Sequence, residues 1–318
     1  MSEEVVYQDV YGSPCLQTTN LPWPKYSGKV RDIYDLGTEL LLVSTDRLTA
    51  FDRPLALIPH KGQVLTQLSA WWFGETKHII ANHYLDLPAF EVMRVKKCKP
   101  LPIEMVVRGY ITGSTNTSLW TLYQQGEREF FGVRLPEGLK KNERLNTPIL
   151  TPTTKSKEHD EPLKEEDLAA IPGLTPKLWE EMQSAALALF QHATQVLAHK
   201  DLLIADTKYE FGVDLKGNLC LIDEVHTPDS SRYWEVHDWE TALKEGREPR
   251  SFDKEVMRLW YRAHCNPYDD KELPIAPPEL IHTTSRRYQE LFQLVTQREL
   301  QRGLLTCAGL SASLAKKM

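Results

Sequence analysis

The alternation of hydrophobic and polar residues predicts short strands in the first third of the chain. Between residues 26 and 45, YSGKVRDIYDL alternates, Gly37 marks a turn and ELLLVST is a short apolar run, a combination that predicts a β-hairpin. Strand-like stretches recur near residues 90–96 and 103–111.

Helical spacing of apolar residues predicts four helices. The clearest is TPKLWEEMQSAALALFQHATQVLAHKD, because Thr175 suits the N-cap and Pro176 the first helical position. The other three are GQVLTQLSAWWFGETKHII, SFDKEVMRLWYRAH and PELIHTTSRRYQELFQLVTQREL. The region from Thr112 to about Glu161 is polar, and we predict loops there.

A second hairpin is predicted from Leu202 to Val225, and its alternation is broken by charge. Side chains alternate along a strand, so Asp206, Lys208 and Glu210 share one face. A two-residue turn at Lys216-Gly217 would set Glu210 directly opposite Asp223, whereas a three-residue turn would shift the pairing by one.

Hairpin connections with helices between them predict an α+β fold with mainly antiparallel sheets. We expect two lobes with a boundary near residues 100–112. The length of 318 residues allows one large domain or two ordinary ones.

Composition narrows the class of protein. The net charge of -6 gives no support for a nucleic-acid partner. Five widely spaced cysteines without a CxxC motif fit a reducing compartment, and we expect the cytoplasm. No apolar run approaches the roughly 18–20 residues of a membrane span, and the acidic start MSEEVVYQDV lacks a signal-peptide stretch.

The charged hairpin face has two explanations at this stage. Two adjacent carboxylates, Glu210 and Asp223, repel each other unless a proton or a cation lies between them. Such oxygen ligands suit Mg²⁺ completed by substrate phosphates, and Lys208 would add a cation for phosphate or carboxylate. The alternative is an exposed ribbon held by cross-strand ion pairs.

Other polar clusters favour a phosphate site. Gly28 and Lys29 in SGKVRD combine an accessible backbone with a point charge, and Arg108 lies near Ser114 in a Gly/Ser turn. Each cluster alone is more typical of a plain turn or a solvated surface; together they indicate a cleft between two lobes. Further candidates are Asp52 in STDRLTAFD, Lys155, His159 and Asp160 in TPTTKSKEHDE, and Ser231 and Arg232 in TPDSSRYW.

Eight segments occur in one order: YSGKVRDIYDLG, LLLVSTDRLTAFD, KGQVLTQLSAWWF, VVRGYITGS, LPEGL, TPILTPTTKSKEHDE, DTKYEFGVD and LIDEVHTPDSSRYW. With them the chain resembles the phosphoribosylaminoimidazole-succinocarboxamide synthase (SAICAR synthetase) family, from about Lys25 to Lys254. The last 60 or so residues are less informative.

The resemblance implies a two-lobed SAICAR-synthase-like fold related to ATP-grasp, with an N-terminal lobe of residues 1–105 and a C-terminal lobe of residues 106–318. It implies a ligase of purine biosynthesis that uses ATP and Mg²⁺. The substrates would be 5-amino-1-(5-phosphoribosyl)imidazole-4-carboxylate (CAIR) and L-aspartate, joined through an acyl phosphate. The partners would be these small molecules, with no nucleic acid or membrane, and the chain would be a monomer or a small homo-oligomer.

The resemblance also assigns roles to residues. The ATP phosphates would lie against Gly28, Lys29, Val30, Arg31 and Lys155, and adenine beside Lys96, Lys97 and Cys98. Glu210 and Asp223 would hold Mg²⁺ and ATP. The ribonucleotide would meet Asp52, Arg108, Ser114, Asp206, Lys208, Ser231 and Arg232, with His159 and Asp160 near aspartate. Lys29, Lys155, Lys208 and Asp223 form the expected catalytic set.

Some points stay open. The insertion in GSTNTSLW leaves Ser114 or Ser118 as the phosphate ligand, and the spacing from Arg108 favours Ser114. Segment 152–162 is the candidate for a mobile loop that keeps water from the acyl phosphate. The alternatives are a small-molecule kinase of related fold, which needs a general base and no amine site, and a nucleotide-binding protein without catalysis, which the presence of Lys29, Glu210 and Asp223 disfavours.

Overall fold

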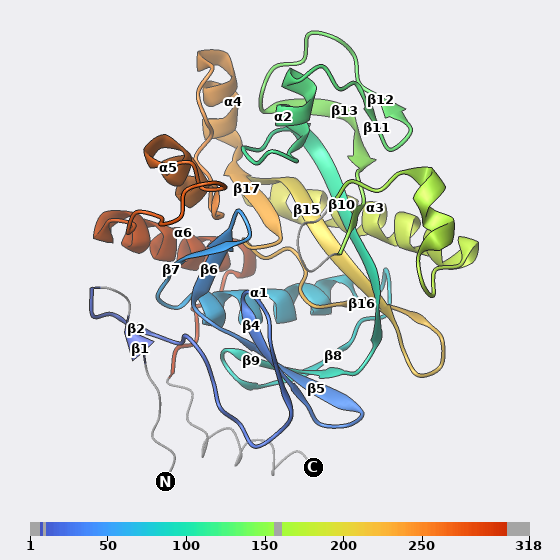
Figure 1. Ribbon diagram of the computed structural model, residues 1–318, viewed down its shortest axis with the longest axis vertical. Coiled ribbons are helices and arrows are strands. Elements are labelled where there is room, and N and C mark those ends of the chain that lie inside the picture. Colours follow the sequence, from blue (N-terminus) through green and yellow to red (C-terminus); the bar gives the residue numbers. More distant parts are fainter. Residues whose placement is uncertain (1–6, 9–10, 156–160, 304–318) are drawn as a thin grey trace. The chain divides into compact units, whose positions relative to one another are not determined.

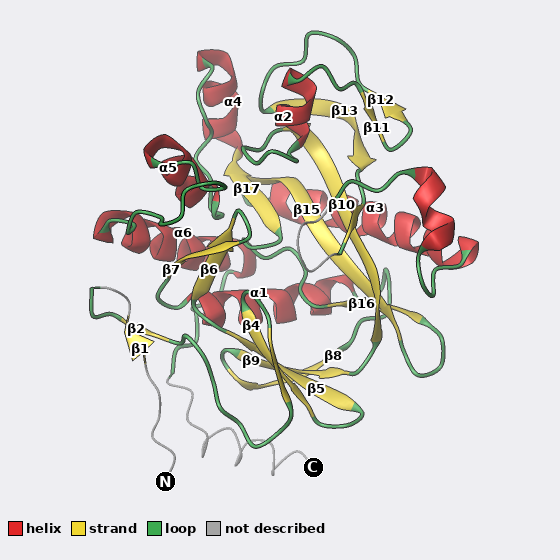
Figure 2. Cartoon of the chain, in the orientation of Figure 1, coloured by secondary structure: helices red, strands yellow, loops and turns green. Residues whose placement is uncertain are grey.

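The computed structural model describes residues 7–8, 11–155 and 161–303, which form helices and antiparallel sheets (Figures 1 and 2). The chain folds into two compact units. Unit 1 consists of the described residues up to Gly74, His83–Lys97 and those from Val256 onward, and unit 2 consists of Glu75–Asn82 and Cys98–Glu255.

Unit 1 contains a five-stranded antiparallel sheet. Its strands, in spatial order, are β3 (Lys25–Ser27), β4 (Arg31–Asp35), β5 (Glu39–Ser44), β9 (Val92–Lys96) and β8 (Tyr84–Ala89). The predicted hairpin is confirmed as β4 and β5, paired from Arg31↔Ser44 to Asp35↔Leu40. Alternate side chains of β4 are buried, and Tyr34 packs with Leu41 and Val43 in the core.

Helix α1 (Lys61–Thr76) of the same unit begins in close contact with the end of β5. Asp46 Oδ1 accepts a hydrogen bond of 2.9 Å from the Gly62 backbone N–H in the first turn. A Cβ atom at Gly62 would lie 2.3 Å from the Ser44 carbonyl oxygen, so this approach requires glycine.

The short strands β6 (Arg47–Ala50) and β7 (Arg53–Leu57) pack against the C-terminal helices. These helices are α5 (Glu255–His264) and α6 (Pro278–Thr296). Leu48 and Ile58 share an apolar core with Met257, Tyr261 and Ile281. The grouping of the units therefore differs from the expected lobes of residues 1–105 and 106–318, because α5 and the first turns of α6 share an apolar core with the β6–β7 hairpin. The remaining strands of this part are β1 (Tyr7–Gln8) and β2 (Pro14–Cys15).

Unit 2 is built on a six-stranded antiparallel sheet. The central path runs β13 (Glu143–Leu150), β10 (Lys99–Ile111), β15 (Leu202–Val213) and β16 (Leu219–Ile222), with β14 (Thr153–Thr154) on β10 and β17 (Ser231–Glu235) on β15. Helix α3 (Pro176–Ala198) buries Met182, Leu189 and Phe190. Its predicted N-cap is confirmed, because Thr175 Oγ1 accepts a 3.2 Å bond from the Leu178 N–H.

The region predicted to be rich in loops, from residue 112 to about residue 161, also contains several regular elements. The region contains α2 (Leu119–Gln124), β11 (Glu129–Phe130), β12 (Val133–Arg134), β13 and β14. The strand β13, ERLNTPIL, mixes polar residues with Pro148, yet it lies at the sheet edge, where proline is tolerated. Its Leu145 and Ile149 pack with Ile111 and Phe130. The helix α4 (Val236–Glu245) and a 3₁₀ helix (Glu165–Ala170) were not predicted either, and neither were the strands β6, β7, β8 and β17.

None of the helices in the described part of the chain combines the length and the hydropathy that a bilayer crossing requires.

Candidate active site

The charged hairpin of unit 2 has a different register from the one predicted first. Glu210 pairs with Ile222, and the turn is closed by a 3.0 Å bond from the Asp214 N–H to the Asn218 carbonyl. The three-residue turn is therefore the correct alternative, and a direct opposition of Glu210 and Asp223 was wrong. Asp223 follows the last residue of β16 and has φ 62°.

Glu210 and Asp223 nevertheless interact. In a regular strand Asp223 would point away from the face shared by Glu210 and Ile222. The left-handed conformation of Asp223 breaks this alternation. The pKa of Glu210 is raised by burial and then by the negative charge of Asp223.

Two lysines lie against this acidic pair. Lys208 Nζ donates a hydrogen bond to Glu104 and is 3.7 Å from Glu210 Oε1. Lys155 Nζ forms an ion pair with Glu210 Oε2. Burial would lower the pKa of Lys208, but Glu104 and Glu210 outweigh it, so the lysine stays protonated. The predicted Lys155, Lys208, Glu210 and Asp223 are thus brought together.

The exposed-ribbon alternative was wrong for this hairpin. Glu104, Asp206 and Glu210 are only 6–7% exposed. Glu104 was absent from the predicted site, although β10 pairs it with Glu210. One feature of the sequence could have indicated Glu104. It lies four residues before Arg108 in the same strand, so the two side chains are on the same face.

Glu210 and Asp223 could hold a metal ion only if water and a bound phosphate supplied the remaining oxygen ligands. Among residues 7–8, 11–155 and 161–303, no group of three or more His, Cys, Asp and Glu side chains is arranged to hold a metal ion. Mg²⁺ commonly takes one or two protein carboxylates and completes its shell with water and phosphate oxygens. Glu210 and Asp223 supply that donor set, and a cation there would relieve the repulsion that raises the pKa of Glu210.

A second cluster joins three neighbouring strands of the same sheet. Asp206 of β15 lies between Arg108 of β10 and Arg232 of β17 in the strand register. Arg232 donates from Nη1 to Asp206 and from Nη2 to Glu255 Oε2, the latter at 3.1 Å. Arg108 Nη1 is 3.7 Å from Asp206 Oδ2. Burial and then the charge of Arg232 lower the pKa of Arg108, so an anion here would stabilise both guanidinium groups.

Ser114 supplies an unused hydroxyl in this cluster. Its side chain is buried, and its Oγ has no hydrogen-bond partner among the described residues; the same holds for Nε of Arg232. Gly113, the preceding residue, has φ 109°, and a Cβ atom there would lie 3.4 Å from Arg232 Nη2. Buried orphan donors beside two arginines are typical of an anion site.

The other serines of the region are engaged within the protein. Ser118 Oγ donates to the Thr115 carbonyl at 2.8 Å and pairs with Thr121 Oγ1 at 2.9 Å. Ser231 Oγ pairs with Thr207 Oγ1 at 2.7 Å.

Unit 1 carries the predicted phosphate-covering turn. The Gly28 N–H donates to the Arg31 carbonyl at 2.8 Å, which closes the turn around Lys29 and Val30. Lys29 Nζ forms an ion pair with Asp52. Asp52 and Phe51 form the tip of the β6–β7 hairpin and both have positive φ, 58° and 54°. Lys29 and Asp52, predicted from separate segments, are thus brought together.

The segment predicted beside adenine lies at the end of β9. The N–H groups of Lys96 and Lys97 are already used, by the carbonyls of His83 and Thr38 at 2.8 and 3.0 Å. Cys98 is buried against Cys220 and Ile222. The predicted His159 and Asp160 lie outside the described residues, as do the central residues of the predicted mobile loop, 156–160.

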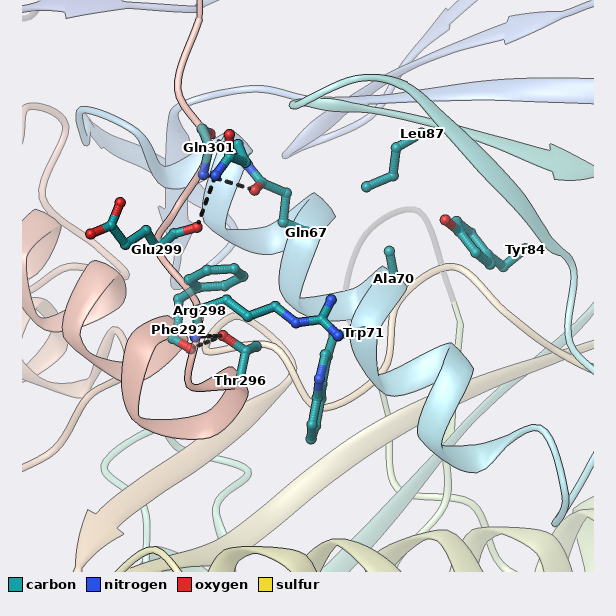
Figure 3. A pocket seen from close by; sticks show the side chains of 10 residues that line it. All are labelled: Gln67, Ala70, Trp71, Tyr84, Leu87, Phe292, Thr296, Arg298, Glu299 and Gln301. Carbon is teal, nitrogen blue, oxygen red and sulfur yellow. Dashed lines mark hydrogen bonds between the residues drawn. The ribbon is translucent and has the colours of Figure 1, made fainter. Parts of the chain in front are cut away.

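A pocket of about 540 Å³ in unit 1 contains none of the predicted site residues. Figure 3 shows Trp71, Phe292 and Arg298 along one part of its wall and Tyr84 and Leu87 along another. The exposed surface of its lining is mainly apolar, in contrast to the charged clusters described above.

Comparisons with known proteins identify the family of the chain. A family model described as SAICAR synthetase matches residues 24–275. The chain is 52% identical over 283 residues to the phosphoribosylaminoimidazole-succinocarboxamide synthase of Legionella pneumophila (strain Paris), covering 89% of this chain and 91% of the relative. It is 48% identical over 290 residues to the chloroplastic enzyme of that name from Arabidopsis thaliana, covering 89% and 71%.

Among solved structures, the chain is similar to the SAICAR-synthase of Saccharomyces cerevisiae complexed with SAICAR. The TM-score is 0.75 and the sequence identity 32%, over 90% of this chain and 100% of the other. The predicted α+β fold of this type is therefore confirmed.

Proposed function

The chain belongs to the SAICAR synthetase family, and from that premise we propose that it joins L-aspartate to the carboxylate of CAIR at the expense of ATP. The observation that carries the proposal is the family match over residues 24–275 together with the buried lysine–carboxylate cluster inside it. The products are SAICAR, ADP and phosphate.

The cluster around Glu210 is proposed to hold the reacting polyphosphate. Glu210 and Asp223 would bind Mg²⁺, which supplies positive charge to the β- and γ-phosphates when bound. Lys155 and Lys208 remain protonated beside them and are raised in pKa by the same carboxylates. Their charges are therefore available to the transferring phosphoryl group and to the CAIR carboxylate.

The arginine cluster is proposed to bind the 5′-phosphate of CAIR. In this cluster Ser114 Oγ and Arg232 Nε are buried donors that have no hydrogen-bond partner among the described residues, and Arg108 adds a second guanidinium. Ser231 would close the site from β17. Asp206 is held between the arginines, which suits a carboxylate that accepts from a ribose hydroxyl.

The turn of Gly28, Lys29, Val30 and Arg31 is proposed to cover the ATP phosphates. Lys29 then exchanges Asp52 for phosphate, and Asp52 becomes available to the substrate. Lys96, Lys97 and Cys98 are proposed beside adenine. His159 and Asp160 are proposed near aspartate, within the loop 152–162 that would exclude water.

The reaction divides into two transfers. A carboxylate oxygen of CAIR attacks the γ-phosphorus, and ADP leaves. The aspartate amine then attacks the acyl carbon and loses its proton, and inorganic phosphate leaves with the carboxylate oxygen. Neither transfer requires a covalent bond between a side chain and the substrate. The residues therefore act by positioning the reactants and by offsetting their charge.

The test is ADP release with purified protein, Mg²⁺, ATP, CAIR and L-aspartate, leaving out each component in turn. A ligase requires all four and forms the succinocarboxamide. ADP release without aspartate has two sources, a kinase and a leaking acyl phosphate; hydroxylamine traps the acyl phosphate as a hydroxamate and leaves a kinase product unchanged. A stable phosphorylated product formed without aspartate would overturn the proposal.

The proposal also includes expectations about the cellular compartment, the oligomeric state and the partners. We place the reaction in a reducing compartment, the cytoplasm, because Cys15, Cys98, Cys220 and Cys265 are free thiols. We expect a monomer or a small homo-oligomer acting on small molecules, without nucleic acid or membrane.

A further inference from the structure

Arg47, a residue with no role in the proposed site, contacts the backbone on both sides of Lys29. Its Nη2 donates to the Gly28 carbonyl at 3.1 Å, and its Nε donates to the Lys29 carbonyl at 3.3 Å. Its Nη1 donates to the Gln17 carbonyl. One planar guanidinium thus ties the turn to two further segments of unit 1.

The next carbonyl of the turn is also held. The Val30 oxygen accepts from the Thr45 N–H at 3.0 Å and from Thr45 Oγ1 at 2.6 Å. Three consecutive carbonyl oxygens, those of residues 28, 29 and 30, are therefore bound by residues 45 and 47. This removes their partial negative charges from the side that would meet a polyanion.

A buried carboxylate fixes Arg47 itself. Asp32 is fully buried and accepts from Arg47 Nη2 at 3.1 Å and from Lys25 Nζ at 2.9 Å. The Thr19 N–H donates to the same carboxylate at 2.8 Å. Because several donors hold Asp32 in place, the Arg47 guanidinium has one orientation. Its hydrogen bonds then fix the position of the Gly28 and Lys29 carbonyls.

We propose that Arg47 is a positioning residue for the phosphate-covering turn: it fixes the Gly28 and Lys29 carbonyls so that the turn is already shaped for ATP phosphates. The inference rests on the proposed function, which supplies the ligand of the turn. Arginine is required because the role uses several donors in one plane, which the single ammonium of lysine cannot supply.

The test compares Arg47→Met with Arg94→Met. Arg94 is a matched control in the same unit: its side chain is 15% exposed against 18% for Arg47, and it pairs with Asp86 and Glu39 without contacting the turn. The measurements are KM for ATP, CAIR and aspartate, kcat, ATP affinity by calorimetry, and the unfolding midpoint.

We expect Arg47→Met to raise KM and Kd for ATP by roughly 10- to 100-fold, because the phosphate contacts lose their alignment. KM for CAIR and aspartate should change less than about twofold, and Arg47→Lys should recover only part of the ATP affinity. Arg94→Met should leave all three KM values near wild type while lowering the unfolding midpoint.

An unchanged ATP affinity in Arg47→Met, or an equal rise in all three KM values, would overturn the inference. Full recovery by Arg47→Lys would also overturn it, since charge alone would then suffice. If Arg47→Met does not fold, Thr45→Val removes the hydroxyl bond to the Val30 carbonyl, together with the longer bond of 3.4 Å that this hydroxyl accepts from the Arg47 N–H. This variant is expected to raise KM for ATP severalfold, and no change would count against the inference. Failure of the wild-type protein to form the succinocarboxamide would instead overturn the proposed function.

Discussion

Lys208 and Glu104, on adjacent strands of the unit 2 sheet, form an ion pair in which the glutamate is buried. Glu210 lies across the strand pair from Glu104 and 3.7 Å from the same ammonium. The Lys208 ammonium therefore lies between two carboxylates. Its hydrogen bond to Glu104 sets the direction in which the side chain points.

Glu104→Gln tests this arrangement. The substitution keeps the size of the side chain but removes the charge that orients Lys208. We expect kcat/KM for CAIR to fall by roughly 10- to 100-fold, with a smaller change in KM for ATP. Steady-state kinetics with each substrate varied in turn measures this. A value of kcat/KM for CAIR within twofold of wild type would mean that Glu104 is not needed to orient Lys208.

Ser114→Ala and Ser118→Ala form a second, matched test. A hydrogen bond to a charged group contributes about 1.5–3 kcal/mol, so Ser114→Ala should raise KM for CAIR by roughly 10- to 100-fold. Ser118 is already bonded to Thr115 and Thr121, so Ser118→Ala should cost about 1 kcal/mol of stability and leave KM unchanged. The reverse result would move the phosphate ligand to Ser118.

Two glycines of α1 give a test of packing. Gly62→Ala sets a methyl group against the Ser44 carbonyl and should lower the free energy of unfolding by about 3 kcal/mol. Gly74 has no atom within 4 Å of an added Cβ, so Gly74→Ala should raise it by about 0.5–1 kcal/mol. Urea unfolding of both variants measures the difference, and equal effects would contradict the close approach at Gly62.

The pH dependence of stability tests Asp32. Burial would raise the pKa of Asp32, but Lys25, Thr19 and Arg47 outweigh it, so the folded pKa is below its usual value. A carboxyl group of this kind stabilises the fold above its unfolded pKa of about 3.9, and the contribution is lost as pH falls through the folded pKa.

Asp32→Asn should therefore lower stability most at neutral pH and flatten its decline in acid. Asp46 is the contrasting case, because burial raises its pKa despite bonds from the Gly62 and Leu16 N–H groups. Ionisation of Asp46 opposes folding, so the free energy of unfolding falls as pH rises from the unfolded to the raised folded pKa of this residue. Asp46→Asn should remove this fall with rising pH, whereas Asp32→Asn should remove a rise with pH. Urea unfolding between pH 3 and pH 7 measures both. Identical profiles for the two variants would contradict the assignment.

Local signals in the sequence predicted α3, where Thr175 as the N-cap and Pro176 as the first helical residue agree with the structure. Local signals also predicted that Glu210 and Asp223 interact, but not the hairpin register or the backbone conformation that allows it. The turn at Lys216-Gly217 fits two lengths, and the left-handed conformation of Asp223 depends on the chain that follows β16. Glu104 was missed because its relation to Glu210 arises from pairing between strands about 100 residues apart.

The same limit explains the helices at the end of the chain. Their amphipathic pattern predicts that each has an apolar face, but not what covers it. For α5 and the first turns of α6 the cover is the β6–β7 hairpin, about 200 residues earlier, and no local pattern in that hairpin indicates this contact. Long-range packing thus decides the grouping of elements that local periodicity identifies.

The central claim is that the carboxylate of CAIR is activated by phosphorylation. The most direct test is a turnover with CAIR labelled with ¹⁸O in the carboxylate, followed by mass spectrometry of the inorganic phosphate. An acyl phosphate predicts one ¹⁸O atom in each phosphate released, because the attacking carboxylate oxygen leaves with phosphorus. Phosphate without ¹⁸O, formed together with the succinocarboxamide, would contradict the account.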